Sequence, residues 1–219
     1  MRIVPLHKTK RTYSCNAYLI LGDWNRVEDV NTLIDPGIDD FVVAEIEGLS
    51  TGFGKVPVQQ ILLTHNHFDH AAGALAIKKR YQARILAAVD GPGVDELLPD
   101  GRFVKAGDDF LEVLHAPVHS SDSLCFYAPA QKALFSGDMQ LKPQLVGDDC
   151  RQDYLAILKK LAGRDITAIY SGHDRPVEKG CNTLIREILA GLRGNGDRVA
   201  AASRLTTDSN NEANTKQHP

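Results

Sequence analysis

Hydrophobic and polar positions along the chain predict short buried strands with helices between them. Apolar runs closed by Gly, Asp or His are typical of strands. Such runs predict strands over residues 16–23, 31–37, 58–64, 83–89 and 166–172, and three strands separated by turns over 110–138. Apolar residues at helical spacing predict helices over residues 39–49, 71–81, 150–163 and 181–192. This order of elements indicates an α/β (α+β) layered fold.

Two stretches break this pattern. Residues 90–101, "DGPGVDELLPDG", are rich in turn formers, and we expect a loop there with one helical turn. From residue 195 onward the sequence becomes polar and large apolar side chains become rare. We therefore expect one domain over residues 1–194 and a flexible polar tail over 195–219.

Composition narrows the kind of protein and its partners. The chain has 219 residues, 43% of them hydrophobic, which is enough to bury a substantial core. Its 28 acidic side chains outnumber its 25 basic ones, so we expect neither nucleic acid nor an anionic membrane as a partner. The first residues lack the apolar stretch of a signal peptide, and no apolar run reaches the length of a membrane span. These features favour a cytoplasmic protein.

The four cysteines do not form a recognisable site. They are scattered along the chain without a CxxC pair, which argues against a zinc ribbon or a redox motif. We expect all of them to be reduced and to act as small hydrophobic residues. They are Cys15, Cys125, Cys150 and Cys181.

The segment "THNHFDH", residues 64–70, follows an apolar run and holds three of the eight histidines of the chain. Alternation can direct His65 and His67 to one point and leave Asp69 and His70 at a neighbouring one. Imidazole and carboxylate groups are ligands for zinc and related metals. Asp69 alone could cap the next helix, but three histidines are too many for capping. The segment predicts a metal site.

Other predicted strand ends supply further ligands. "ALFSGD" and "AIYSGH" are apolar runs that end in Ser-Gly followed by Asp138 and His173. Glycine before each ligand lets the backbone approach a crowded centre. In "APVHSSDS" we favour His119 over the nearby His115, because a turn can aim its side chain inward. The two remaining histidines lie near the chain ends and are expected in solvent; they are His7 and His218.

The order of the motifs "NAYLI", "TLIDPG", "THNHFDH", "PVHSSDS", "FSGD" and "YSGH" resembles the metallo-β-lactamase superfamily of dinuclear hydrolases. The resemblance covers all but the polar tail. It implies a four-layer αββα sandwich with two metals at one edge of the sheets, and Asp35 as the residue that orients the ligand loop. It assigns one metal to His65, His67 and His119, the other to Asp69, His70 and His173, and the bridging position to Asp138.

The resemblance to glyoxalase II, the hydroxyacylglutathione hydrolase of this superfamily, implies a zinc-dependent hydrolase for a small thioester or ester. Two Zn²⁺ ions, with Fe or Mn as alternatives, would share a hydroxide that attacks the substrate. Asp69 would carry a proton toward the leaving group. A small molecule is the expected partner, and a homodimer stays open.

Several departures and alternatives bear on the substrate. True β-lactamases generally place Cys or Ser where this chain has Asp138, and the lactonases of the family tend to carry Tyr where it has Leu141. After His173 the chain offers one clear helix, which disfavours glutathione recognition. An iron persulfide dioxygenase would use His65, His119 and Asp138 as its metal ligands. A lactonase, a phosphodiesterase and a non-catalytic binding protein also stay open.

Overall fold

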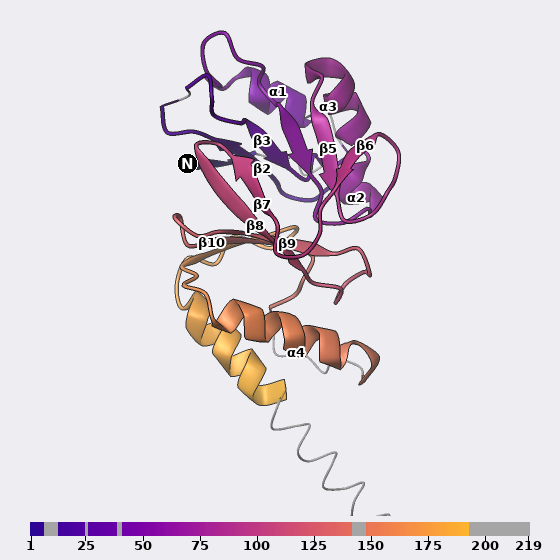
Figure 1. Ribbon diagram of the computed structural model, residues 1–219, viewed down its shortest axis with the longest axis vertical. Coiled ribbons are helices and arrows are strands. Elements are labelled where there is room, and N and C mark those ends of the chain that lie inside the picture. The colour runs from indigo at the N-terminus through magenta and orange to yellow at the C-terminus, as the bar shows by residue number, and fades with distance from the viewer. Residues whose placement is uncertain (7–12, 25, 39–40, 142–147, 193–219) are drawn as a thin grey trace, which may run out of the picture.

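Two stacked β-sheets with helices on their outer faces make up the fold (Figure 1). The computed structural model describes residues 1–6, 13–24, 26–38, 41–141 and 148–192, without the side chains of 148–151. The first sheet holds its strands in chain order, namely β1 (Arg2–Leu6), β2 (Ala17–Leu21), β3 (Thr32–Ile34), β4 (Gln60–Leu62), β5 (Arg84–Ala87) and β6 (Val94–Leu97). The second sheet runs in the order β11 (Ala168–Ser171), β10 (Ala133–Gly137), β9 (Leu124–Ala128), β8 (Asp109–His115) and β7 (Phe103–Ala106).

Helices complete the four layers. α1 (Phe41–Glu47) and α3 (Ala74–Tyr81) cover the first sheet, and the short α2 (Phe68–Ala71) leads into α3 (Figure 1). α4 (Asp148–Ala162) and a helix over residues 181–192 cover the second sheet. This helix–sheet–sheet–helix order confirms the expected αββα sandwich.

Three apolar layers hold the sandwich together. Neighbouring residues of one strand point into different layers: Leu33 packs under α1 and α3, whereas Ile34 lies between the sheets. Phe126 and Phe135 of the second sheet fill the same middle layer and are at most 1% exposed. A third cluster joins the second sheet to the two C-terminal helices. Because central strands are buried on both faces, they appear in the sequence as continuous apolar runs.

The structure confirms most predicted elements and corrects four regions. Residues 94–97 form strand β6, so the prediction of a loop with a helical turn over residues 90–101 was wrong. This strand lies at the sheet edge, where Asp95 accepts a hydrogen bond from the Ile85 backbone and pairs with Lys78. The helix expected over residues 71–81 begins at Ala74, as α3, and a separate short helix, α2, lies before it over Phe68–Ala71. Strands β1 and β7 were not predicted from the sequence.

Some expectations lie outside the described residues. These are the polar tail over 195–219, His7, His218 and the side chain of Cys150. The other three cysteines are unpaired and buried, as expected; they are Cys15, Cys125 and Cys181. Within the described ranges, no helix has both the length and the apolar character that crossing a membrane requires.

Strand directions bring distant parts of the chain to one edge. β3, β4 and β5 are parallel to one another, and β10 is parallel to β11. β8 has the same direction as β10, because both are antiparallel to β9. The two sheets touch at this edge, where the Leu124 backbone N–H donates to the Thr64 carbonyl at 2.7 Å. The loops that follow four different strands therefore meet there.

The layer between the sheets yields a stability prediction. Phe126→Ala removes a fully buried ring, and we expect the free energy of unfolding to fall by about 3–5 kcal/mol. Phe110→Ala, in the same sheet but 49% exposed, is the matched control and should change it by no more than about 0.5 kcal/mol. Urea unfolding of both variants measures the difference. Equal losses in the two variants would contradict the assignment of this layer as the core.

Candidate metal centre

All seven side chains that the sequence singled out meet at the edge where the two sheets touch. Their ring nitrogens and carboxylate oxygens form overlapping groups whose ligand atoms lie within 4.8 Å of one another. The groups are His65, His67 and His119; His65, His70 and Asp138; and Asp69, His70 and His173. These residues come from the segment after β4, where α2 holds Asp69 and His70, and from the loops after β8, β10 and β11.

In the first group, the buried imidazole of His65 lies beside two exposed imidazoles. His67 Nδ1 and His119 Nε2 are 3.0 Å apart, and both side chains are exposed. The ring of His65 lies 4.6 Å from that of His67 and 4.9 Å from that of His119, measured between centroids. His65 is 2% exposed, and its Nε2 has no hydrogen-bond partner among the described residues. A buried polar atom of this kind is typical of a position completed by a ligand.

The second group is more deeply buried. His173 Nε2 lies 3.1 Å from Asp69 Oδ2 and 3.3 Å from His70 Nε2. Asp138 lies between the two groups. Its Oδ1 is 3.1 Å from His70 Nε2, and its Oδ2 is 3.4 Å from His173 Nε2 and 3.7 Å from His119 Nε2. One carboxylate thus reaches both sets of imidazoles.

His115, the competitor of His119, lies outside these groups. It is exposed, and its Nε2 lies 2.9 Å from the Ser121 carbonyl oxygen. The turn that follows instead positions His119. Asp122 Oδ1 accepts from the Ser120 hydroxyl at 2.6 Å, and Asp122 Oδ2 accepts from the Asn66 backbone N–H at 2.8 Å. The "HSSDS" turn therefore ties the loop of His119 to the loop of His67, a role that the sequence did not reveal.

Asp35 orients the segment that carries the ligands through hydrogen bonds. Its Oδ2 lies 2.8 Å from His70 Nδ1, and its Oδ1 accepts from the Thr64 backbone N–H at 2.8 Å. The residue has a left-handed backbone with φ of 50°, which Asp tolerates better than most residues. The sequence singled out Asp35 but missed Thr64. Thr64 precedes His65 directly, so its place in the motif was the available signal.

Burial and charge act differently on the two central histidines. Burial lowers the pKa of His65 to about 4, and the neighbouring His70 contributes to this decrease. Burial also lowers the pKa of His70, but the Asp35 and Asp138 carboxylates outweigh it and raise that pKa above its ordinary value. Desolvation raises the pKa of Asp138, but His173 and His70 outweigh it and hold that pKa below the usual range. A bound cation would replace the proton on His70, because metal ligands must be deprotonated.

Gly172 lets the backbone pass close to this cluster. A Cβ at this position would lie 2.3 Å from Asp138 Oδ1 and 2.7 Å from His70 Cε1. The Gly172 N–H donates to the Gly137 carbonyl at 2.8 Å, which fixes the two ligand loops relative to each other. The expectation that glycine is needed for close approach is confirmed here.

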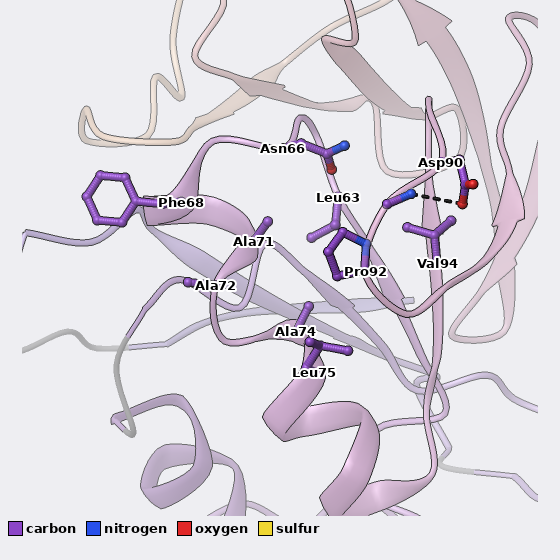
Figure 2. A pocket seen from close by; sticks show the side chains of 11 residues that line it. Leu63, Asn66, Phe68, Ala71, Ala72, Ala74, Leu75, Asp90, Pro92 and Val94 are labelled. Carbon is purple, nitrogen blue, oxygen red and sulfur yellow. Dashed lines mark hydrogen bonds between the residues drawn. The ribbon is translucent and has the colours of Figure 1, made fainter.

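Two hollows lie near the centre. One, of about 340 Å³, lies between the α2–α3 segment and the loop before β6 (Figure 2), and its wall is mostly apolar. It contains Asn66 and Phe68 but none of the seven candidate ligands, because these two side chains alternate with the ligands along the loop. A second hollow, of about 280 Å³, does include His173, together with Asn16, Tyr18 and Arg175.

Comparisons with known proteins agree with this geometry. The sequence profile described as "Metallo-beta-lactamase superfamily" matches residues 11–91 and 82–173. These matches cover more than half of the chain. The chain belongs to the metallo-β-lactamase superfamily.

Curated relatives place the chain among glyoxalase II-like members of the superfamily. It is 30% identical over 179 residues to a probable hydroxyacylglutathione hydrolase of Schizosaccharomyces pombe, over 78% of this chain and 68% of the relative. It is also 30% identical over 128 residues to a hydroxyacylglutathione hydrolase of Mesorhizobium japonicum, over 52% of this chain and 48% of the relative. The match therefore spans about two thirds of the first relative and about half of the second.

Solved structures support the fold. A metallo-beta-lactamase family protein of Thermus thermophilus aligns with a TM-score of 0.67 at 19% identity, covering 91% of this chain and 82% of that one. The B3 metallo-beta-lactamase BLEG-1 aligns with a TM-score of 0.60 at 22% identity, covering 80% and 93%. At these identities the likeness concerns the sandwich and not the reaction.

The close approach at Gly172 yields a prediction about the cluster. Gly172→Ala places a methyl group against Asp138 and His70, and we expect affinity for Zn²⁺ to fall about tenfold or more. Gly191→Ala is the matched control, since nothing lies within 4 Å of its added Cβ, and it should bind Zn²⁺ as the unchanged protein does. Titration of both variants against a chelating dye measures the affinity. Equal affinity in the two variants would contradict the contact.

Proposed function

We propose that this chain is a metal-dependent hydrolase that acts on a small thioester or ester. The observation that carries the proposal is the pair of His-rich groups that share the Asp138 carboxylate. Membership of the superfamily and similarity to hydroxyacylglutathione hydrolases support it. The donor set of imidazoles and carboxylates suits zinc, and iron or manganese could bind the same set.

The buried donors fit a pair of cations. The unpartnered Nε2 of His65 would face one ion, together with His67 and His119. Asp69, His70 and His173 would hold the other ion, and Asp138 would contact both. When bound, such ions polarise a substrate carbonyl and lower the pKa of water.

Asp69 is the side chain we propose for proton transfer. It is 6% exposed, and its Oδ2 lies 3.1 Å from His173 Nε2. A carboxylate held at the edge of the second group can receive a proton at Oδ2 and release it to a leaving thiolate or alkoxide. The surrounding imidazoles keep it oriented for this role.

A substrate panel tests which member of this class the chain hydrolyses. The relatives' matched parts leave out a third to a half of their length, so their glutathione conjugate is not carried over to this chain. A panel should contain glutathione thioesters, other small thioesters, aryl esters, lactones and a phosphodiester. Turnover of the last two alone would favour the lactonase or phosphodiesterase alternative.

Metal content and activity together test the proposal. We expect about two Zn²⁺ per chain by plasma mass spectrometry, loss of thioester hydrolysis after chelation, and recovery on adding Zn²⁺. One iron per chain with oxygen consumption on a persulfide would overturn the hydrolase and favour the dioxygenase. No bound metal and no turnover would indicate a binding protein.

The two neighbouring histidines provide a matched pair of variants. His119→Ala removes a proposed ligand, and we expect kcat/KM for the best thioester to fall about 100-fold or more. His115→Ala removes an exposed imidazole outside the ligand groups and should change it by no more than about twofold. Metal content of both variants is measured alongside the kinetics. A comparable loss from His115→Ala would contradict the assignment of His119.

A further inference from the structure

Thr64 occupies a central position behind the ligand groups, although it is not a candidate ligand itself. It is 2% exposed, and its hydroxyl oxygen lies 2.6 Å from Asp35 Oδ2 and 3.1 Å from His65 Nδ1. Its side chain therefore stands between a buried carboxylate and a buried imidazole. Gly137, at the end of β10, lies against the same side chain, since a Cβ there would be 2.8 Å from Thr64 Oγ1.

The number of available protons fixes the direction of these hydrogen bonds. An ionised carboxylate only accepts, and a hydroxyl has a single proton to donate. Asp35 Oδ2 therefore receives the Thr64 hydroxyl proton, at 2.6 Å. The remaining lone pairs of Thr64 Oγ1 can only accept, so the proton between Thr64 and His65 belongs to His65 Nδ1. This assigns the Nδ1–H tautomer to His65 and leaves Nε2 with its lone pair.

The same carboxylate orients the other group. Asp35 Oδ2 also lies 2.8 Å from His70 Nδ1, so that ring nitrogen carries a proton as well and Nε2 faces Asp138. His65 and His70 share one group with Asp138. His70 is in addition part of the group with Asp69 and His173, and His65 is part of the group with His67 and His119. A hydrogen bond from one ring nitrogen fixes which nitrogen can bind a metal.

We propose that Thr64 is a positioning residue that links the Asp35 carboxylate to His65, so that one buried acid sets the tautomer of His65 and the ring orientation of His70 in the two ligand groups. Asp35 acts on His70 directly and on His65 through the Thr64 hydroxyl. Both rings are then oriented with Nε2 toward the centre before any cation arrives, and His65 already has its Nε2 lone pair free. The positioning role rests on the proposed function, because it concerns metal binding. The relay of hydrogen bonds from Asp35 through Thr64 to His65 forms without a cation.

The test compares Thr64→Val with Thr64→Ser. Valine keeps the β-branched shape against Gly137 and removes the hydroxyl, whereas serine keeps the hydroxyl. In metal-free protein with ¹⁵N-labelled histidine, two-bond ¹H–¹⁵N correlation spectra identify the tautomer of each ring. We expect the Nδ1–H form for His65 in the unchanged protein and in Thr64→Ser, and a shift toward the Nε2–H form in Thr64→Val.

Cation binding gives a second readout. We expect one of the two Zn²⁺ binding steps to weaken about 10- to 100-fold in Thr64→Val and to stay within about threefold in Thr64→Ser. Thr32→Val is the matched control. It removes a buried threonine hydroxyl that donates to the Val30 carbonyl and accepts from Gln60 Nε2, away from every candidate ligand. Its Zn²⁺ affinity should not change.

The outcomes separate this inference from the proposed function. An unchanged His65 tautomer in a folded Thr64→Val variant, confirmed by circular dichroism, would overturn the relay whether or not zinc binds. A changed tautomer with unchanged Zn²⁺ affinities would overturn the positioning role. Failure of the unchanged protein to bind any cation would remove the proposed function, and the relay would then be judged by the spectra alone.

Discussion

The first sheet touches the second at Thr64, and the candidate centre is built around this contact. The Thr64 carbonyl accepts a hydrogen bond from Leu124 of β9, while Gly137 of β10 lies against its side chain. Protein interiors are close-packed and resist deformation. The contact therefore fixes the spacing between His65, which follows Thr64, and Asp138, which follows Gly137. The same contact therefore determines how the two sheets stack and how far apart the ligand groups lie.

The balance of charge at this edge depends on the same contact between the sheets, because it places buried carboxylates beside imidazoles. Asp35 and Asp69 are almost fully buried, and an unpaired buried carboxylate is costly. Each lies within ion-pair distance of an imidazole, Asp35 of His70 and Asp69 of His173. Protons on these imidazoles or bound cations can balance the carboxylates. The same residues therefore form the candidate cation site and stabilise this edge of the sandwich.

Central strands were predictable because their two faces are both buried, which makes their sequences continuously apolar. The edge strands β1, β6 and β7 were not predictable in this way. In β6 the exposed positions alternate with half-buried ones, and Asp95 gains its partners, the Ile85 backbone and Lys78, only from neighbouring elements. The edge strand β11 was predicted because its sequence is an apolar run, but a short edge strand with two acidic residues among its four, such as β6, has no such pattern.

The sequence by itself determined the family, the layered fold and the types of candidate ligand, because "THNHFDH" and the Ser-Gly-Asp and Ser-Gly-His strand ends are local patterns. Only the tertiary structure decided that His119 joins the cluster and His115 does not. It also revealed that Thr64 links Asp35 to His65. The physical reason is the sequence separation of the contacts. Spacing along a strand fixes where neighbouring side chains point, whereas distances between residues far apart in sequence depend on how the two sheets stack.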